Sequence, residues 1–195
     1  MTVRGEQRGL SVPEPSRLAE MGLCDAVAVP ARTPVAEISP GDGQWIVIRE
    51  AGHPVAAVPA AVLRRVPPDR PVLDAVRDAP ATVIAHAGES VAHALASWAF
   101  SQLAADGAAV IVDEAGGCRV WAGEDLAEVR DLAGRRTAID TRLPGDEVRI
   151  PRLSRPCRFN GPGDPCAAVL SFAEFPEPMP ECPNPGRLSP HRFVW

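Results

Sequence analysis

Two segments of the chain repeat the same order of elements, and this repeat constrains the fold more than any single motif. Residues 44–66 and 108–129 each begin with a β-branched run, which predicts a buried strand. Each run leads to the tripeptide Glu-Ala-Gly, whose glycine can take the positive φ of a hairpin turn, and then to a second strand. A short helix is expected to close each segment, over 60–65 and 124–130.

A further matching piece lies upstream of each segment. Residues 25–38 and 80–107 both predict a short strand, a polar turn and the start of a helix. In the first copy the run Ser-Pro-Gly-Asp-Gly at 39–43 must break that helix, so the first copy is expected to be truncated. In the second copy Ser90 fits the N-cap position. The helix that follows places four apolar side chains on roughly one face: Val91, Leu95, Trp98 and Leu103.

A strand–helix–strand–strand–helix unit in tandem is the pattern of the CBS-domain pair, or Bateman module, and residues 10–132 resemble that family. The stretch AAVIVDEAGGCRVWAGEDL (108–126) is similar to the end of a CBS motif. The resemblance implies an α/β (α+β) fold in which a tandem CBS pair forms a pseudo-twofold disc. The first motif (10–67) would be truncated and degenerate, the second would span 68–132, and 1–9 would be an N-terminal tail. The resemblance also implies a homodimer through the disc.

The clefts of CBS pairs often bind adenosine nucleotides, and the resemblance points to one residue for such a ligand. Asp125 matches the aspartate that holds the ribose hydroxyls in that family. The Thr/Ser position three residues earlier is Ala122, however, and the matching first-copy positions are Pro59 and Val62, which offer no polar side-chain group. A helix-terminal carboxylate favoured by the helix dipole is the alternative interpretation of Asp125. If AMP, ADP, ATP or S-adenosylmethionine binds, we expect it in the second cleft.

Composition narrows the class of function. The chain has 195 residues, of which 46% are hydrophobic, enough to bury a core. Its formal net charge is −5, which argues against a surface that binds nucleic acid. The chain has arginine but no lysine, a bias typical of a high-GC bacterial genome. No signal peptide and no apolar run of membrane-spanning length stand out. We therefore expect a cytoplasmic protein with neither a nucleic-acid nor a membrane partner.

The polar residues of the repeat form no recognisable catalytic arrangement. Ser90 and His93 are three residues apart, but no carboxylate or oxyanion motif accompanies them. Neither a Gly-x-Ser-x-Gly elbow nor a phosphate-binding loop occurs, and the chain has no lysine to complete such a loop. Cys24 and Cys118 are interpreted as small buried hydrophobic residues. The sequence therefore predicts a protein that is not an enzyme.

The composition changes after residue 132. Residues 133–155 are polar and rich in arginine, which predicts a linker or an arm that returns over the disc, with an edge strand around 146–153 broken by Pro151. Residues 156–195 are rich in proline, and within them only 166–175 looks regular, as one strand or a short helix. A segment of this kind buries too little apolar area to fold alone, so we expect a cross-link to hold it in a folded state.

Four side chains in this last segment form a complete ligand set for a tetrahedral metal ion. They follow the spacing C-x8-C-x15-C-x8-H and are Cys157, Cys166, Cys182 and His191. Three thiolates and one imidazole are a structural zinc set, and metal binding would supply the missing folding free energy. The gaps of eight residues exceed those of common zinc motifs. A [2Fe–2S] centre is an alternative, and so are a Cys157–Cys166 disulfide or free thiols with a solvated His191.

Two functions from different classes follow. The first is a non-enzymatic regulatory and interaction module, in which the CBS disc is a dimerisation platform and a zinc-ribbon-like C-terminal segment docks an unidentified protein partner. The alternative is a regulatory protein that senses an adenosine nucleotide through the second CBS cleft. The apolar residues at Pro59, Val62 and Ala122 favour the first function, because they remove polar groups that a nucleotide would need.

Overall fold

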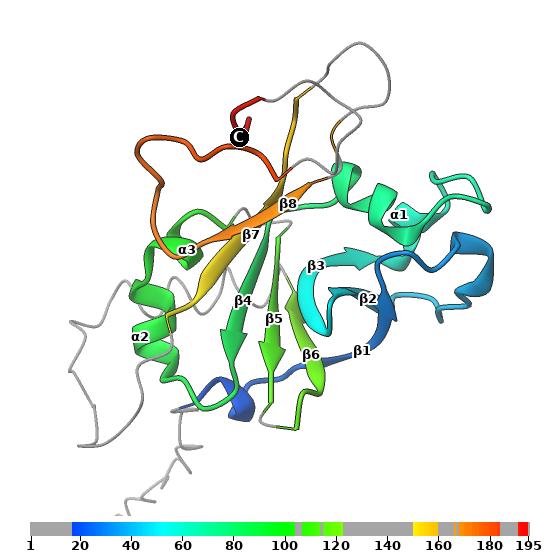
Figure 1. Cartoon of the computed structure of the whole chain (residues 1–195). Helices are drawn as coiled ribbons and strands as arrows, with labels where there is room; N and C mark the ends of the chain where they lie inside the picture. The colour runs from blue at the N-terminus through cyan, green and yellow to red at the C-terminus, as the bar shows by residue number, and fades with distance from the viewer. Residues whose placement is uncertain are drawn as a thin grey trace, which may run out of the picture.

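The fold is mixed α/β, with one eight-stranded sheet in the order β3-β2-β1-β6-β5-β4-β7-β8 and few, short helices (Figure 1). A computed structural model describes residues 17–103, 107–113, 115–122, 150–159, 166, 168–183 and 191–194. The strands are Cys24–Pro30 (β1), Trp45–Glu50 (β2), His53–Pro59 (β3), Thr82–His86 (β4), Ala108–Val112 (β5), Cys118–Ala122 (β6), Arg152–Pro156 (β7) and Val169–Phe172 (β8). The helices are Ala60–Leu63 (α1), Val91–Ala96 (α2) and Trp98–Ser101 (α3), with 3-10 turns at Leu18–Glu20, Val35–Glu37 and Val72–Asp78. None of these described helices has the length and apolar character needed to cross a bilayer.

The first six strands form two units with one topology, which confirms the tandem repeat of strands. In the first unit β1 runs parallel to β2, and β2 pairs antiparallel with β3. In the second unit β4 runs parallel to β5, and β5 pairs antiparallel with β6. The helix expected at 60–65 is present as α1, whereas the one expected at 124–130 lies outside the described residues. Membership of the CBS family stays a prediction.

The hairpin turns of both units use the backbone geometry that the sequence predicts. Ala51 and Gly52 form the two-residue connection between the paired Glu50 and His53, with φ angles of 47° and 85°. Gly116 takes a φ of 78° in the corresponding turn of the second unit. Two consecutive positive φ angles match the right-handed twist of the flanking strands, so this turn fixes the β2–β3 register.

The parallel strands of the two units are joined by different crossovers. The first crossover contains one 3-10 turn, as its helix-breaking residues predict. In the second, the Ser90 hydroxyl accepts the His93 N–H at 3.5 Å and caps α2, but the single helix that we expected is interrupted at Ser97. The Ser97 hydroxyl donates to the Ala94 carbonyl at 2.6 Å and accepts the Phe100 N–H at 3.4 Å. It therefore ends α2 and caps α3, because a serine can offer both groups to nearby backbone.

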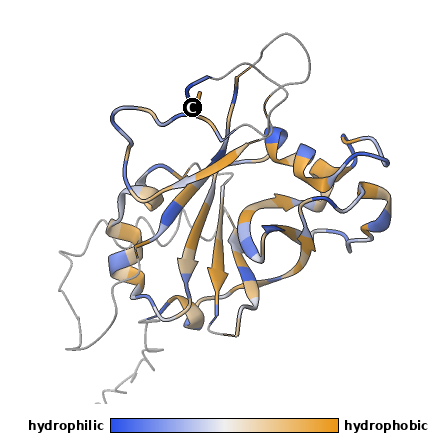
Figure 2. Ribbon diagram, in the orientation of Figure 1, coloured by the Kyte–Doolittle hydropathy of each residue, from blue (hydrophilic) through white to orange (hydrophobic). Residues whose placement is uncertain are grey.

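The strands are largely hydrophobic (Figure 2), and successive side chains along each strand point to opposite faces of the curled sheet, an inner and an outer one. Outer side chains of the first unit pack with α1 and include Val29, Ile46, Ile48, Ala56 and Val58. Outer side chains of the second unit pack with α2 and α3 and include Val83, Ala85, Ala109, Ile111 and Trp121. Inner side chains of the two units meet each other and include Val47, Ala57, Ala108, Val110 and Val120. The inner residues are small because the concave side of a curled sheet leaves little room.

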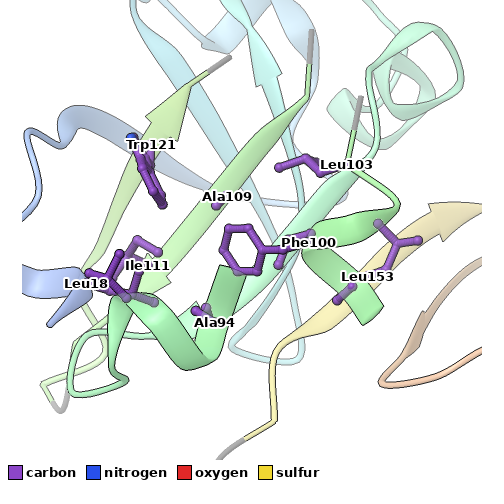
Figure 3. Close-up of a cluster of buried hydrophobic side chains, with 12 residues drawn as sticks. Leu18, Ala94, Phe100, Leu103, Ala109, Ile111, Trp121 and Leu153 are labelled. Carbon is purple, nitrogen blue, oxygen red and sulfur yellow. The ribbon is translucent and has the colours of Figure 1, made fainter. Parts of the chain in front are cut away.

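The outer cluster of the second unit is centred on Phe100 of α3 (Figure 3). Its ring centroid lies 6.3 Å from that of Trp121, and both side chains are almost fully buried. Leu18, from the 3-10 turn at the start of the described chain, and Leu153, from β7, complete the cluster. Strand β7 therefore packs with the second unit and belongs to the same folded body.

The two units of the curled sheet meet at two junctions, and different contacts close each of them. At one junction β1 pairs antiparallel with β6 over a short ladder. At the other, the edge strand β3 meets two buried hydroxyls: the Ala57 N–H donates to Thr82 Oγ1 at 3.0 Å, and the Ser154 hydroxyl donates to the Val55 carbonyl. Thr82 and Ser154 are direct partners in the β4–β7 ladder, and we call them the hydroxyl pair. They provide hydrogen bonds that a neighbouring strand would otherwise supply to β3.

The structure corrects the prediction for one cysteine and defines the bounds of the two C-terminal strands. Cys24 is exposed, so its interpretation as a buried hydrophobic residue is wrong; it is the first residue of β1, at the end of the short junction ladder. Cys118 is half-buried, and burial raises the pKa of its thiol. The strand near Pro151 begins after that proline and is not an edge strand, because β7 pairs with both β4 and β8. The regular stretch at 166–175 contains one strand, β8.

Candidate metal centre

The first two predicted ligands are held by the hairpin of β7 and β8, which we call the first hairpin. The β7–β8 ladder ends with the pair Pro156 and Val169. Beyond it the Cys157 N–H donates to the Ala168 carbonyl at 2.8 Å, and the Cys166 N–H donates to the Phe159 carbonyl at 3.1 Å. These bonds extend the hairpin past the ladder, so Cys157 and Cys166 lie on opposite arms at the base of its loop.

The other two ligands are held by a second reversal of the chain, the second hairpin, at 180–193. Glu181 and Arg192 form an isolated antiparallel bridge. Next to that bridge the Cys182 N–H donates to the His191 carbonyl at 3.0 Å, while the Phe193 N–H donates to the Pro180 carbonyl at 2.9 Å. In the second hairpin too, therefore, the two ligands lie on opposite arms. The C-terminal end of the described chain lies near the end of β7 in Figure 1.

The structure brings the four predicted ligands together. Cys157 Sγ lies 3.6 Å from His191 Nε2, and Cys166 Sγ lies 3.5 Å from Cys182 Sγ. All four ligand atoms lie within 4.8 Å of one another. Zinc–ligand bonds of about 2.3 Å to sulfur and about 2.0–2.1 Å to nitrogen give tetrahedron edges of roughly 3.6–3.8 Å. The cluster therefore has the size of a site for a single ion, and it could bind one.

Aromatic side chains enclose one side of the cluster. The Phe159 ring stacks on the His191 imidazole, with centroids 3.9 Å apart and planes inclined by 11°. Phe193 is buried and meets Phe172 of β8 edge-on at 5.5 Å. Cys157 and Cys166 are almost fully buried, whereas Cys182 is half-buried. These contacts fix the imidazole plane and restrict the approach of water to two of the three sulfurs.

Hydrogen bonds and burial act in opposite directions on the pKa of Cys157 and in the same direction on the pKa of Cys182. Burial raises the pKa of Cys157, but N–H groups of Val194 and Phe159, together with His191, outweigh it and leave that pKa below its usual value. The Val194 N–H donates to Cys157 Sγ at 3.5 Å. Burial and the neighbouring Cys166 and Cys157 raise the pKa of Cys182 to about 12. Adjacent thiolates repel one another, and a divalent cation is what would allow all three to ionise together.

The cluster joins the second hairpin to the first, and the two are also linked by the Arg158 N–H, which donates to the Val194 carbonyl at 2.9 Å, and by the contact of Phe193 with Phe172. The first hairpin is tied to the sheet by the β4–β7 ladder, by buried Leu153 and by Val169, which packs against the outer core of the first unit. The second hairpin has its own bridge and the buried Phe193 among its described contacts. Each hairpin supplies two ligands, so one ion would bridge them.

The nucleotide site implied by the CBS resemblance rests on one residue. Asp125 lies outside the described residues, so its role stays a prediction. Val62 is buried in the core around α1, and Pro59 immediately precedes that helix. Ala122 is the half-buried last residue of β6. The Ser90 hydroxyl accepts the N–H of His93 and caps α2, so the described contact between these two residues is a structural one.

Two features of the centre escaped the sequence analysis. Phe159 stacks on His191, and the Val194 N–H points at Cys157 Sγ. A weak signal for the first was present, because an aromatic residue stands two positions after the first cysteine. The second had no signal, since any residue except proline carries a backbone N–H.

Comparisons with known proteins assign no family to the chain. No protein-family model matches it, and no curated protein matches it either. The geometry of the metal-ligand cluster is therefore what bears most directly on function.

Proposed function

We propose that the chain is a non-enzymatic interaction module whose C-terminal segment is held on the sheet by one structural zinc ion. The observation that carries the proposal is the cluster of four ligand atoms within 4.8 Å of one another. Four protein ligands fill a tetrahedral shell and leave no position for a substrate or an activated water. The role of such an ion is to fold and hold the segment.

The size and chemistry of the cluster support a single zinc ion. Three sulfurs and one imidazole nitrogen in a tetrahedral arrangement suit zinc, which has no geometric preference of its own to oppose them. A [2Fe–2S] centre inserts two irons and two sulfides between its ligand pairs and so holds those pairs further apart than one ion does. All four ligand atoms lie within 4.8 Å of one another, whichever way they are paired, and this fits the smaller centre.

The segment held by the ion offers apolar contacts to a protein partner. Among the described residues, the large apolar side chains with the greatest exposure are Ile150, Phe175 and Val194. All three belong to the part of the chain that follows the repeat, and Val194 also contacts the metal cluster through its N–H. We propose that these exposed side chains contribute to docking a protein, and that metal binding fixes the segment that carries Phe175 and Val194.

Within this proposal the six strands of the repeat form a CBS-type disc that pairs with a second copy. Two observations support the disc: the shared topology of the units, and the reciprocal arrangement of their junctions. The first strand of each unit lies beside the third strand of the other, β1 beside β6 and β4 beside β3, as a pseudo-twofold pair requires. Sensing of an adenosine nucleotide through Asp125 is the alternative, and no described residue favours it.

Elemental analysis of the purified full chain tests the proposal. We expect about one zinc per chain in protein purified without chelators, and a loss of zinc in Cys166→Ser. Cys24→Ser is the matched control, because it makes the same chemical change at an exposed thiol outside the cluster. Zinc below about half an equivalent in wild-type protein would refute the metal centre.

Two further measurements address the disc. Size-exclusion chromatography with light scattering should give a dimer mass for the zinc-loaded chain. Thermal melts with AMP, ADP, ATP and S-adenosylmethionine should leave the melting temperature unchanged, because a ligand that binds only the folded chain raises it. A saturable increase with any of the four would favour the sensing alternative.

A further inference from the structure

We propose that Cys166 and Cys182 form a disulfide when the protein meets a hydroperoxide, so that the metal centre is also an oxidant-responsive site. The inference rests on the proposed metal centre and adds a chemical reaction to it. Its basis is the placement of the two sulfurs on different hairpins, 3.5 Å apart, with unequal access to solvent.

The contacts of the third cysteine explain why this pair reacts. Cys157 Sγ lies against two nitrogens, His191 Nε2 at 3.6 Å and the Val194 N–H at 3.5 Å. Hydrogen bonds of this kind stabilise a thiolate and hold it in place. Cys182 also interacts with Cys157, but its sulfur lies 3.5 Å from that of Cys166, and this separation must shorten to about 2.05 Å for a disulfide to form.

Access sets the order of the two steps. Cys166 and Cys157 are almost fully buried, whereas Cys182 is half-buried and is the sulfur that a small oxidant reaches first. Cys182 Sγ attacks one oxygen of the hydroperoxide, the O–O bond breaks, and for hydrogen peroxide water leaves after protonation. The product is a sulfenic acid at Cys182.

The second step closes the disulfide. The Cys166 thiolate attacks the sulfenic sulfur of Cys182, an S–S bond forms, and hydroxide leaves as water after taking a proton. In total two thiolates, one hydrogen peroxide and two protons give one disulfide and two waters. The thiolates lose two electrons and the peroxide gains them, so no other reactant is needed.

Oxidation replaces the metal ion that links the two hairpins with a disulfide that links them. The ion loses two of its four ligands and is released, because two remaining ligands hold zinc weakly. The new disulfide still joins the first hairpin to the second, since Cys166 belongs to one and Cys182 to the other. Cys157 and His191, which had been ligands of the ion, are left as a thiol and an imidazole in contact.

Peptide mapping of the oxidised protein tests the pairing directly. Trypsin cleaves after arginine, and the peptide 159–187 contains both Cys166 and Cys182, whereas Cys157 lies in the peptide 153–158. A disulfide between Cys166 and Cys182 therefore removes two hydrogens from 159–187 without joining it to another peptide. Cleavage after Glu174 then separates the two cysteines in sequence, and the fragments stay linked only through the disulfide.

The experiment starts from full-length protein with its zinc content measured, and follows zinc release with a chromogenic chelator while hydrogen peroxide is added. We expect about one equivalent of zinc to leave with the same time course as the disulfide forms, and dithiothreitol to reverse both. Cys24→Ser should respond as wild type does. Cys182→Ser should form no disulfide within 159–187.

The outcomes separate this inference from the proposed function. Zinc-loaded protein that keeps its ion in peroxide, or that joins 153–158 to 159–187 through Cys157, overturns the inference and leaves the structural metal in place. Oxidation of Cys182 to sulfinic acid without a disulfide also overturns it. Wild-type protein that purifies without metal overturns both. Because the mapping uses wild-type protein, the result does not depend on a variant that folds.

Discussion

Replacement of Thr82 by valine tests how the curled sheet is closed. Thr82 is almost fully buried in β4, and its Oγ1 accepts the N–H of Ala57, which has no exposed surface. Valine has nearly the shape of threonine, so Thr82→Val leaves no cavity, and its main effect is to remove that acceptor together with the hydroxyl that donates to the Ala57 carbonyl at 3.5 Å. Strand β3 would then present a buried N–H and a carbonyl without these partners at its edge, beside β4.

The expected loss of stability follows from opposing terms. A buried N–H left without an acceptor costs about 1–3 kcal/mol. The methyl group that replaces the hydroxyl gains about 0.8 kcal/mol from burial. The difference is about 0.2–2.2 kcal/mol, and loss of the hydroxyl donor to the Ala57 carbonyl adds about 0.5–1.5 kcal/mol. We therefore expect Thr82→Val to lower the free energy of unfolding by about 0.7–3.7 kcal/mol, which corresponds to about 1–15 °C in melting temperature for a chain of this size. Ser154→Ala removes the donor to the Val55 carbonyl, and its effect should not add fully to that of Thr82→Val, because the two side chains are ladder partners.

Equilibrium unfolding in urea at a fixed zinc concentration measures these changes. Thr33→Val is the matched control, a half-buried threonine outside the strands, and we expect it to change the free energy of unfolding by less than about 0.5 kcal/mol. If Thr82→Val also falls within that limit, the Ala57 N–H is not held by the hydroxyl pair and the proposed closure of the curl is wrong. A cost in Thr82→Val with full additivity to Ser154→Ala would show instead that the two hydroxyls act independently.

Three further predictions concern other parts of the molecule. Ala51→Gly should raise the free energy of unfolding by up to about 1 kcal/mol, measured in urea, because Ala51 has a φ of 47° and glycine takes this conformation without steric cost. Phe100→Ala should lower it by about 3–5 kcal/mol and shift the tryptophan emission, since Phe100 is almost fully buried against Trp121. Zinc affinity should rise with pH across the neutral range, because the raised pKa of Cys182, about 12, means that its proton must leave when the metal binds. Calorimetry in buffers of different ionisation enthalpy would detect that proton, and identical enthalpies in all buffers would contradict the prediction.

The elements predicted correctly are those whose signals are local. The β-branched runs at 46–48 and 110–112 lie in buried strands, and the positive φ at Gly52 and Gly116 belongs to the turns that join them to their neighbours. A run of such residues and a glycine after it carry their information within a few positions. The break at Ser97 was missed because a serine inside an apolar helical pattern is compatible with an unbroken helix.

The closure of the curl had no such local signal. Thr82 is 25 residues from Ala57, and Ser154 is 99 residues from Val55, so these pairs become visible only when the strands are placed. The exposure of Cys24 has the same origin. Its apolar surroundings in the sequence predict burial, but it is the first residue of β1, at the end of the β1–β6 ladder, and is exposed.

The metal ligands show why a spacing rule can mislead when the structural frame is unknown. Short gaps between paired ligands are needed where one tight turn carries both, since the chain between them must be short enough to keep them together. In a hairpin the distance between opposite residues is set by the ladder and stays at about 5 Å whatever the length of the loop. A longer loop costs little extra closure entropy, about 0.6 kcal/mol for each doubling of its length. The hydrogen bonds of Cys157 to Ala168 and of Cys182 to His191 are the extensions of two such ladders. The repeated gap of eight residues is therefore compatible with a compact four-ligand centre, and the informative pattern is a cysteine or histidine on each arm of a hairpin.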